Sequence, residues 1–274
     1  MSLFTKAQIE AFAEQQFAYI LVEHNDNVLT ITLNREAKRN ALCPKMVHEL
    51  AYAISYAQGN NAIWAVVLKS TGPVFCAGAD LKAFMGMTEP HNSTIPDPKE
   101  EILVGEIFNK LYKPSICIVQ GDVYAGGFFF LAGSNYVVAK KGIKLGLPEV
   151  KRGLYPFQVM AALLNVMPAR KVIDWCIRGY NLPVKKAHEL GLVTHLVKKG
   201  KAEEVAEAII AELTANSPTA IRMGLEAYDH IRQTSTTEQH KYLHHMLLKT
   251  LQSKDAQEGL KAFKEKRPAQ WTGE

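Results

Sequence analysis

The sequence predicts an α/β fold with a largely parallel sheet, followed by a helical C-terminal part. Short continuous apolar runs such as Ile63–Leu68 and Ser115–Val119 are typical of strands buried on both faces. Helical stretches separate these runs, and strands that alternate with helices favour a parallel sheet. Beyond Phe157 the strand pattern nearly vanishes, apart from Val193–Val197, and apolar residues recur at helical spacing.

The first elements follow from local patterns. Alternating residues predict two strands, Ala18–Glu23 and Val28–Leu33, joined by a hairpin turn at Asn25-Asp26-Asn27. Pro44 suits the first turn of a helix that runs to about Ala57.

The middle of the chain adds a strand at Tyr136–Ala139 and helical stretches at Glu101–Leu111 and Gly127–Ala132. Thr88–Lys99 is rich in Pro, Ser, Thr and Asn without periodicity, which predicts a mobile loop. Helical spacing predicts the C-terminal helices at Ala202–Leu213, Thr219–Ile231, Glu238–Leu251 and Asp255–Glu265.

The composition is that of a globular protein with a core, since 47% of the 274 residues are hydrophobic and 22% are charged. No run reaches the roughly 18 apolar residues of a membrane span, and the opening MSLFTKAQIEAF lacks the apolar centre of a secretory signal. The four cysteines show no metal or redox spacing, and Cys117 and Cys176 are expected to be buried thiols. We therefore expect a cytoplasmic protein with no metal and no membrane contact.

The formal charge of +5 is mild, and no basic stripe interleaved with aromatic residues points to nucleic acid. A basic cluster does lie near the C-terminus, at Lys261, Lys264, Lys266 and Arg267. It is either a solvated helix face or a site for a phosphate-bearing ligand.

Two turns rich in small residues follow predicted strands directly. PVFCAGADLK (Pro73–Lys82) follows the first buried strand, and GDVYAGGFFFL (Gly121–Leu131) follows the second. A strand, a small-residue turn and a helix start leave backbone N–H groups unpaired, and such groups hold a phosphate or a developing oxyanion. Each turn alone is also explained by tight turning or close packing. Together they suggest two N–H donors that converge on one carbonyl oxygen.

Glu149 lies in KLGLPEVKRGLYP (Lys144–Pro156), with several apolar neighbours. A carboxylate among apolar groups has a raised pKa and suits proton transfer at neutral pH. The alternative is a solvent-facing Glu149 paired with Lys151 or Arg152.

Taken in this order, the segments resemble the enoyl-CoA hydratase/isomerase (crotonase) family over nearly the whole chain. The resemblance is carried by LNREAKRNAL (Leu33–Leu42), VFCAGADLK (Val74–Lys82), GDVYAGGFFFLAG (Gly121–Gly133), LPEVKRGLYP (Leu147–Pro156) and SKDAQEGLKAFKEKRPAQW (Ser253–Trp271). It implies a crotonase-like spiral of β-β-α turns with an acyl-CoA site in residues 1–198. It also implies a helical region in residues 199–274 that contacts CoA and assembles a homotrimer or hexamer.

The resemblance further implies that the backbone N–H groups of Ala79 and Gly127 stabilise a thioester enolate and that Glu149 is the acid/base. The residues that it places against the acyl-CoA substrate are Arg39, Ala41, Ala79, Asp80, Leu81, Lys82, Phe130, Phe263 and Lys266. No metal and no nicotinamide cofactor is implied, because coenzyme A is part of the substrate.

The chain departs from the fullest family motif at Phe130, which stands where that motif has its first glutamate. Two carboxylates can hold a water between them, whereas one suits moving a proton between C2 and C4 of an enoyl-CoA. Isomerisation and hydration both stay open, since some relatives without the first carboxylate also hydrate. Asp80, Asp122 or Tyr124 are candidates for a second polar group, although Asp80 also suits a helix N-cap.

Two other functions remain as alternatives. One is decarboxylation or another crotonase-type reaction on an acyl thioester, because a fold does not fix a reaction. The other is non-enzymatic binding of acyl-CoA or RNA.

Overall fold

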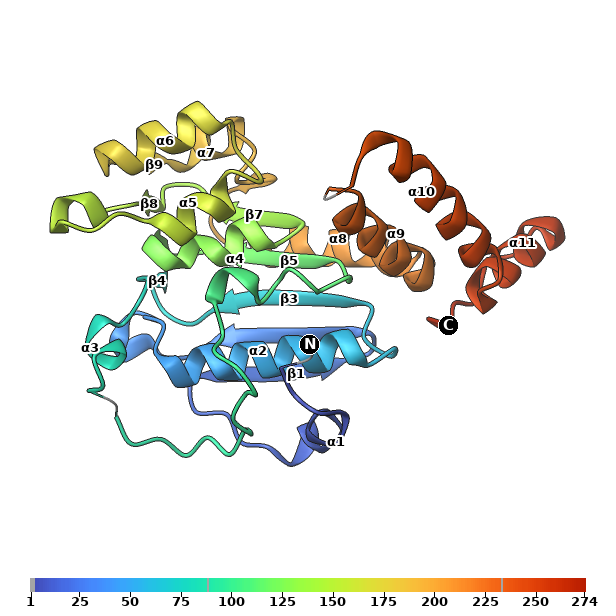
Figure 1. Ribbon diagram of the computed structural model, residues 1–274, viewed down its shortest axis with the longest axis horizontal. Coiled ribbons are helices and arrows are strands. Elements are labelled where there is room, and N and C mark those ends of the chain that lie inside the picture. Colours follow the sequence, from blue (N-terminus) through green and yellow to red (C-terminus); the bar gives the residue numbers. More distant parts are fainter. Residues whose placement is uncertain (1–2, 88, 233) are drawn as a thin grey trace.

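Two sheets form the centre of the protein (Figure 1). The computed structural model describes residues 3–87, 89–232 and 234–274. The larger sheet has six strands in the order β1-β2-β3-β5-β7-β10. Their bounds are β1 (Ile20–Asn25), β2 (Val28–Leu33), β3 (Ala65–Ser70), β5 (Ser115–Val119), β7 (Tyr136–Lys140) and β10 (His195–Val197). The β1–β2 hairpin is antiparallel and the other neighbours pair in parallel, which confirms the predicted sheet.

The smaller sheet consists of three-residue strands in the order β4-β6-β8-β9. These are β4 (Val74–Cys76), β6 (Asp122–Tyr124), β8 (Lys144–Gly146) and β9 (Asn181–Pro183). The first three are parallel neighbours, and β9 pairs antiparallel with β8. In the chain, β4, β6 and β8 follow β3, β5 and β7, and each pair of strands then leads into helical turns. This repetition is the predicted spiral of β-β-α turns.

Short helices join the strands of the spiral. The α-helices are α1 (Lys6–Glu10), α2 (Pro44–Gly59), α3 (Leu81–Phe84), α4 (Phe128–Gly133), α5 (Phe157–Leu163), α6 (Ala169–Arg178) and α7 (Val184–Glu189). The 3₁₀ turns are η1 (Ala11–Glu14), η2 (Glu36–Lys38), η3 (Val104–Glu106), η4 (Ala125–Gly127) and η5 (Glu149–Arg152). As predicted, α2 begins at Pro44.

The predicted helix over Glu101–Leu111 is wrong, because only the 3₁₀ turn η3 forms there. Gly105 disfavours a helix interior, and a Cβ on it would lie 3.2 Å from the ring of Phe129 on α4. The apolar spacing that suggested a helix comes instead from side chains such as Ile107 and Phe108, which are buried in the core.

Four longer helices follow the spiral, where helical spacing predicted them. They are α8 (Ala202–Thr214), α9 (Pro218–Ile231), α10 (Thr236–Leu251) and α11 (Lys254–Glu265). Helix α8 packs on the six-stranded sheet, with Ala206 and Ile209 in one core cluster with Val67 and Ile116. The helices that stand away from the spiral in Figure 1 are therefore α9 to α11. The division between residues 198 and 199 stays a prediction, and α8 shares its core with the residues before it.

The buried carboxylate of Asp255 joins α9, α11 and the last residues of the chain. Its Oδ1 accepts hydrogen bonds from the backbone N–H of Thr272 at 2.8 Å and of Gly273 at 3.2 Å. Its Oδ2 accepts from the N–H of Thr219 at 3.3 Å and from the Ser217 hydroxyl at 3.1 Å. Burial alone would raise the pKa of Asp255, but these hydrogen bonds outweigh it and hold the pKa below its usual value. The carboxylate thus fixes the packing of this helical region.

The segment predicted as a loop has neither helix nor strand over residues 89–99, while Thr88 lies outside the described residues. It is tied to the N-terminal part of the chain. The backbone N–H of Thr94 donates to the Gln16 carbonyl at 3.0 Å, and the N–H of Gln16 donates to the Thr94 hydroxyl at 2.8 Å. Ile95 is buried in the core. The mobility predicted for this loop stays a prediction.

Burial agrees with the predicted core. Every residue of β5 is buried, and Cys117 and Cys176 are buried free thiols as expected. Within the part of the chain that the structure describes, no helix has both the length and the apolar character needed to cross a membrane.

Candidate active site

Three turns with candidate residues follow neighbouring strands of the smaller sheet. Strand β4 leads into residues 77–80, β6 into 125–127 and β8 into 147–149. The strands are parallel, with Cys76 opposite Val123 and Tyr124 opposite Gly146. Because neighbouring parallel strands end at the same edge of a sheet, the three turns lie together, where α/β proteins commonly bind ligands.

The first two turns are in direct contact. A Cβ built on Gly78 would lie 2.6 Å from the Cβ of Ala125 and 3.2 Å from the backbone nitrogen of Gly126. A Cβ on Gly126 would in turn lie 3.7 Å from the backbone nitrogen of Ala79. Gly78 also has φ +90°, a conformation that residues with a side chain rarely adopt. The glycines therefore allow the two turns to approach, as the sequence suggested.

The N–H of Ala79 is directed by its neighbours. Leu42 donates its N–H to the Gly78 carbonyl at 2.8 Å and accepts from the N–H of Asp80 at 2.8 Å. In a trans peptide the C=O and N–H point in opposite directions, so the Ala79 N–H points away from Leu42. Among the described residues this N–H has no hydrogen-bond acceptor. Ala79 is an exposed residue, and the part of the fold that the structure describes does not use this donor.

Gly127 is the last residue of η4 and the N-cap of α4. A Cβ on it would lie 2.9 Å from Val123 Cγ1 and 3.0 Å from the Cys76 carbonyl oxygen. There is no room for a side chain here, because α4 begins directly against β4 and β6. The turn thus brings the positive end of the α4 backbone to the same edge of the sheet as Ala79.

Glu149 begins η5 after Pro148. Its Oε2 atom is buried and has no hydrogen-bond partner among the described residues. Burial raises the pKa of Glu149 above its usual value, and a hydrogen bond from its own backbone and the nearby charge of Arg152 offset this only in part. The described ion pairs do not include Glu149. These observations favour the apolar environment over the solvent-facing ion pair.

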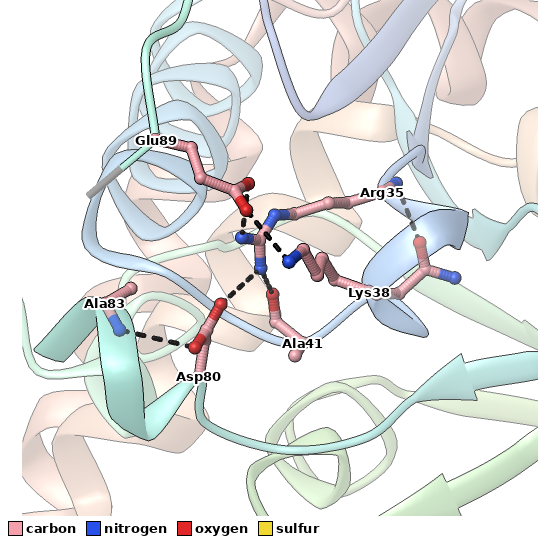
Figure 2. Close-up of polar contacts among 7 residues, drawn as sticks. Arg35, Lys38, Ala41, Asp80, Ala83 and Glu89 are labelled. Carbon is pink, nitrogen blue, oxygen red and sulfur yellow. Dashed lines mark hydrogen bonds and ion pairs between the residues drawn. The ribbon is translucent and has the colours of Figure 1, made fainter. Parts of the chain in front are cut away.

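Arg35 connects the first turn to the segment before Leu42 (Figure 2). Its Nη1 donates to Asp80 Oδ2 at 2.8 Å and to the Ala41 carbonyl at 3.0 Å. Asp80 Oδ1 accepts from the N–H of Ala83 at 3.3 Å, so Asp80 is also the N-cap of α3, as the sequence suggested. Sequence reasoning did not single out Arg35, because an arginine in a polar segment gives no sign of being only 7% exposed.

Glu89 completes this charged cluster from the segment after α3. It accepts from Arg35 Nη2 at 3.2 Å and pairs with Lys38 at 2.9 Å. Figure 2 shows Glu89 above the Arg35 guanidinium and Asp80 below it.

Most of the residues predicted to contact the substrate lie along the same two segments. The Arg39 carbonyl accepts from the N–H of Ala77 at 3.0 Å, so residues 39–42 run beside residues 77–80. Leu81 and Lys82 follow on α3 and are exposed. The predicted residues that the fold brings together are Arg39, Ala41, Ala79, Asp80, Leu81 and Lys82.

Phe130 is 1% exposed. Its ring packs edge-on against Phe75 and Phe108, with ring centres 5.7 and 6.0 Å away. The neighbouring Phe129 instead lines a cavity of about 280 Å³ between η3, α4 and α5. None of the predicted site residues is among those that line this cavity.

Phe263 and Lys266 are not brought to these turns within one chain. They belong to the end of α11, which Figure 1 shows at the opposite end of the molecule from α3. Phe263 is 86% exposed.

The other polar candidates, Asp122 and Tyr124, bond to one another. The Tyr124 hydroxyl donates to Asp122 Oδ2 at 3.2 Å, and Asp122 Oδ1 accepts from the N–H of Lys144 at 2.8 Å. In the described ranges no group of three His, Cys, Asp or Glu side chains is placed to hold a metal ion.

Comparison with known proteins identifies the family. The profile of the family described as "Enoyl-CoA hydratase/isomerase" matches residues 23–274. A protein named "Enoyl-CoA hydratase EchA19" from Mycobacterium tuberculosis is 32% identical over 252 residues, which cover 90% of this chain and 94% of that protein. "Mevalonyl-coenzyme A hydratase sidH" from Aspergillus fumigatus is 27% identical, over 89% of this chain and 91% of its own length.

Solved structures give the same result. The crystal structure of an enoyl-CoA hydratase from Mycobacterium tuberculosis superposes with a TM-score of 0.82 at 32% identity, covering 94% of this chain and all of that one. An enoyl-CoA hydratase, EchA1, from Mycobacterium marinum superposes with a TM-score of 0.82 at 30% identity, over 94% of this chain. The match to the family profile over most of the chain, together with these relatives, shows that the chain belongs to the enoyl-CoA hydratase/isomerase family and acts on acyl-CoA.

Proposed function

We propose that the protein moves a proton on the acyl group of an enoyl-CoA thioester through Glu149, while the N–H groups of Ala79 and Gly127 stabilise the enolate oxygen. The observation that carries the proposal is the buried, unpartnered Oε2 of Glu149, beside turns that include the free N–H of Ala79. A carboxylate with a raised pKa exchanges protons near neutral pH. Removal of one oxyanion donor typically costs about 10²–10³-fold in kcat.

The leading reaction is migration of the double bond from C3 to C2. The carboxylate of Glu149 removes a proton from C2 of a 3-enoyl-CoA, and the electron pair moves into the thioester carbonyl as a dienolate. The same carboxyl group returns the proton to C4, so the atoms balance without water. One acid/base suffices, and Phe130, at the place of the second, is buried against Phe75 and Phe108.

Hydration of a 2-enoyl-CoA is the second candidate. The names of the relatives favour it, since both proteins compared by sequence are called hydratases. Hydration requires a water at C3, which Glu149 would have to activate without a carboxylate at position 130.

The substrate contacts complete the proposal. Arg39, Ala41, Leu81 and Lys82 hold the CoA part, and Phe263 and Lys266 reach it from another subunit of a homotrimer or hexamer, since α11 lies far from α3 in one chain. CoA enters as part of the substrate, and the reaction needs no metal or nicotinamide cofactor. We place the protein in the cytoplasm.

The test is to incubate the protein with 3-enoyl-CoA and, separately, with 2-enoyl-CoA, and to follow the products by chromatography and mass. Isomerisation leaves the mass unchanged, whereas hydration adds one water. Glu149→Gln should remove the activity, and Glu189→Gln, an exposed glutamate paired with Lys186, should not. Full activity in Glu149→Gln would overturn the proposal.

A dicarboxylic acyl-CoA serves as the comparison substrate. Its decarboxylation in preference to the enoyl thioesters would favour the alternative crotonase-type reaction. Binding of acyl-CoA without turnover of any of the three substrates would favour a binding protein.

A further inference from the structure

We propose that Arg35 is a positioning residue that fixes the direction of the Ala79 N–H and neutralises the carboxylate beside it. The inference rests on the proposed function, because it takes the Ala79 N–H as a donor to the thioester oxygen. Arg35 touches neither the substrate atoms nor Glu149 in this assignment. It acts through the segments on either side of the donor.

Arg35 binds both segments of the Leu42–Ala79 bridge that directs the Ala79 N–H. The Ala79 N–H points outward because Leu42 binds the Gly78 carbonyl and the Asp80 N–H. Arg35 Nη1 binds the Ala41 carbonyl, one residue before Leu42, and the Asp80 carboxylate, one residue after Ala79. One guanidinium nitrogen therefore keeps residues 41–42 aligned with residues 79–80 at the Ala79 N–H.

Arg35 is itself fixed in place. Its backbone N–H donates to Asn40 Oδ1 at 2.8 Å, and the Asn40 amide donates to the carbonyls of Thr71 and Val74, both at 2.9 Å. The guanidinium carbon lies 5.2 Å from the centre of the Tyr19 ring. With 7% of its surface exposed, Arg35 is a rigid attachment between β4 and the donor turn.

The charge of Arg35 has a second effect. Asp80 directly follows Ala79 in the chain, so its carboxylate adds a negative charge close to the residue whose N–H faces the thioester oxygen in the proposed function. An uncompensated carboxylate there would repel the charge that develops on this oxygen and raise the barrier. The ion pair with Arg35 at 2.8 Å offsets the repulsion.

Glu89 provides a matched control. It binds the other end of the same guanidinium at 3.2 Å, but it is half exposed and lies after α3. Solvent screens such a pair, so its loss should cost little. Glu89→Gln keeps the shape of the side chain and leaves both contacts of Arg35 Nη1 in place.

The experiment compares Arg35→Met, Arg35→Lys, Asp80→Asn, the Arg35→Met/Asp80→Asn double variant and Glu89→Gln. Asp80→Asn retains an N-cap for α3 while it removes the charge, since asparagine caps helices well. Each variant is assayed for kcat and KM on the enoyl-CoA that the wild type converts. In parallel, the infrared carbonyl stretch of a bound saturated acyl-CoA, ¹³C-labelled at the thioester, is recorded. This thioester does not turn over, so the shift of its stretch reports hydrogen bonding to the oxygen independently of the reaction.

We expect binding to the wild type to lower the infrared frequency of the thioester carbonyl. Binding to Arg35→Met should produce only a small part of that shift. Its kcat should fall about 10–100-fold with less than about a threefold change in KM, which is the pattern of a lost transition-state interaction. Arg35→Lys should recover only part of the shift, because its ammonium is a strongly hydrated point charge on a flexible stem and holds the Ala41 carbonyl and the Asp80 carboxylate less rigidly than the buried guanidinium does. Asp80→Asn should restore part of the kcat that Arg35→Met loses, and Glu89→Gln should match the wild type.

The outcomes separate this inference from the proposed function. A wild-type shift that Arg35→Met retains in full overturns the role of Arg35 and leaves the oxyanion donors standing. The role of Arg35 is also overturned if the effects of the two single substitutions on kcat simply add, as free energies, in the double variant. Residues that act independently give additive effects. Absence of any shift in the wild type overturns the donors themselves and the role of Arg35 with them. A variant that fails to fold is identified by thermal unfolding, and Asp80→Asn and Arg35→Lys then carry the test.

Discussion

Gly78 and Ala125 meet where the first two turns of the site cross, so closely that a Cβ on Gly78 would lie 2.6 Å from the Cβ of Ala125. Gly78→Ala should push the turns apart and strain a backbone held at φ +90°. We expect a loss of about 2–5 kcal/mol in the free energy of unfolding and of most of the activity. Gly86 is the control, because it has φ +88° but no atom of the described residues beyond its chain neighbours lies within 4 Å of the added Cβ. Gly86→Ala should cost only about 1–2 kcal/mol. Equal losses would contradict the contact.

Glu149→Gln should make the protein more stable near neutral pH while it removes the activity. Burial raises the pKa of Glu149, so the fold favours the protonated form. The stability that this group contributes is present at low pH and is lost as the pH rises through its pKa in the folded state. Glutamine does not titrate, so the advantage of the variant should grow with pH. Thermal unfolding from about pH 4 to about pH 8 measures it, and an advantage independent of pH would refute the buried carboxylate.

In the proposed function, the same raised pKa sets the acid limb of the pH–activity profile. Glu149 acts as a base only when ionised, so kcat/KM should rise with pH around a midpoint above the ordinary value of 4.5. Because Arg152 partly offsets the burial, Arg152→Gln should move the midpoint further up. A midpoint that does not move would show that another group controls the limb.

Asp255→Asn should loosen the helical region of α9 to α11. The side-chain amide of the asparagine places its N–H groups against donors such as the N–H of Thr272. We therefore expect the free energy of unfolding, measured in urea, to fall by about 2–4 kcal/mol. Since the pKa of Asp255 is lowered, its stabilisation is present above the ordinary value of 3.8 and is lost as pH falls through the folded pKa. The difference in the free energy of unfolding between the wild type and Asp255→Asn should therefore shrink as the pH falls. Asp97→Asn, in an exposed pair with Lys45, is the control.

Phe130→Glu should not turn the protein into a two-carboxylate hydratase. The side chain would enter a site packed by Phe75 and Phe108, and an unpaired buried carboxylate commonly costs about 3–5 kcal/mol. Phe130→Leu removes the ring without the charge and should cost less. A folded Phe130→Glu protein with faster hydration would show that the site has room for a second carboxylate.

Much of the fold could be predicted because its signals are local. Ser115–Val119 is a strand at the predicted bounds, and the long C-terminal helices have clear helical spacing. Strand β3 begins at Ala65, slightly after the predicted run. The strands β4, β6, β8 and β9 were missed, because three residues show no periodicity and such strands form only by pairing with segments distant in the chain.

The site was predicted unevenly for the same reason. Its turns are visible as glycines after strands, and resemblance gave roles to Ala79, Gly127 and Glu149. Arg35 was not found, because its importance comes from Asp80, which lies 45 residues further along the chain. A partly buried ion pair between residues so far apart in the chain exists only once the chain is folded.

The free N–H of Ala79 is a main-chain group, and this affects how the protein can change over generations. A point mutation to any residue except proline replaces the side chain at residue 79 but leaves its amide N–H in place, provided the bridge to Leu42 is kept. Glu149 has no such protection, since one base change can delete its carboxylate. In the proposed function, the backbone donor that binds the thioester oxygen is thus tolerant of mutation, whereas the carboxylate that transfers the proton is easily replaced. A duplicated gene can then acquire a new reaction while it keeps the donor.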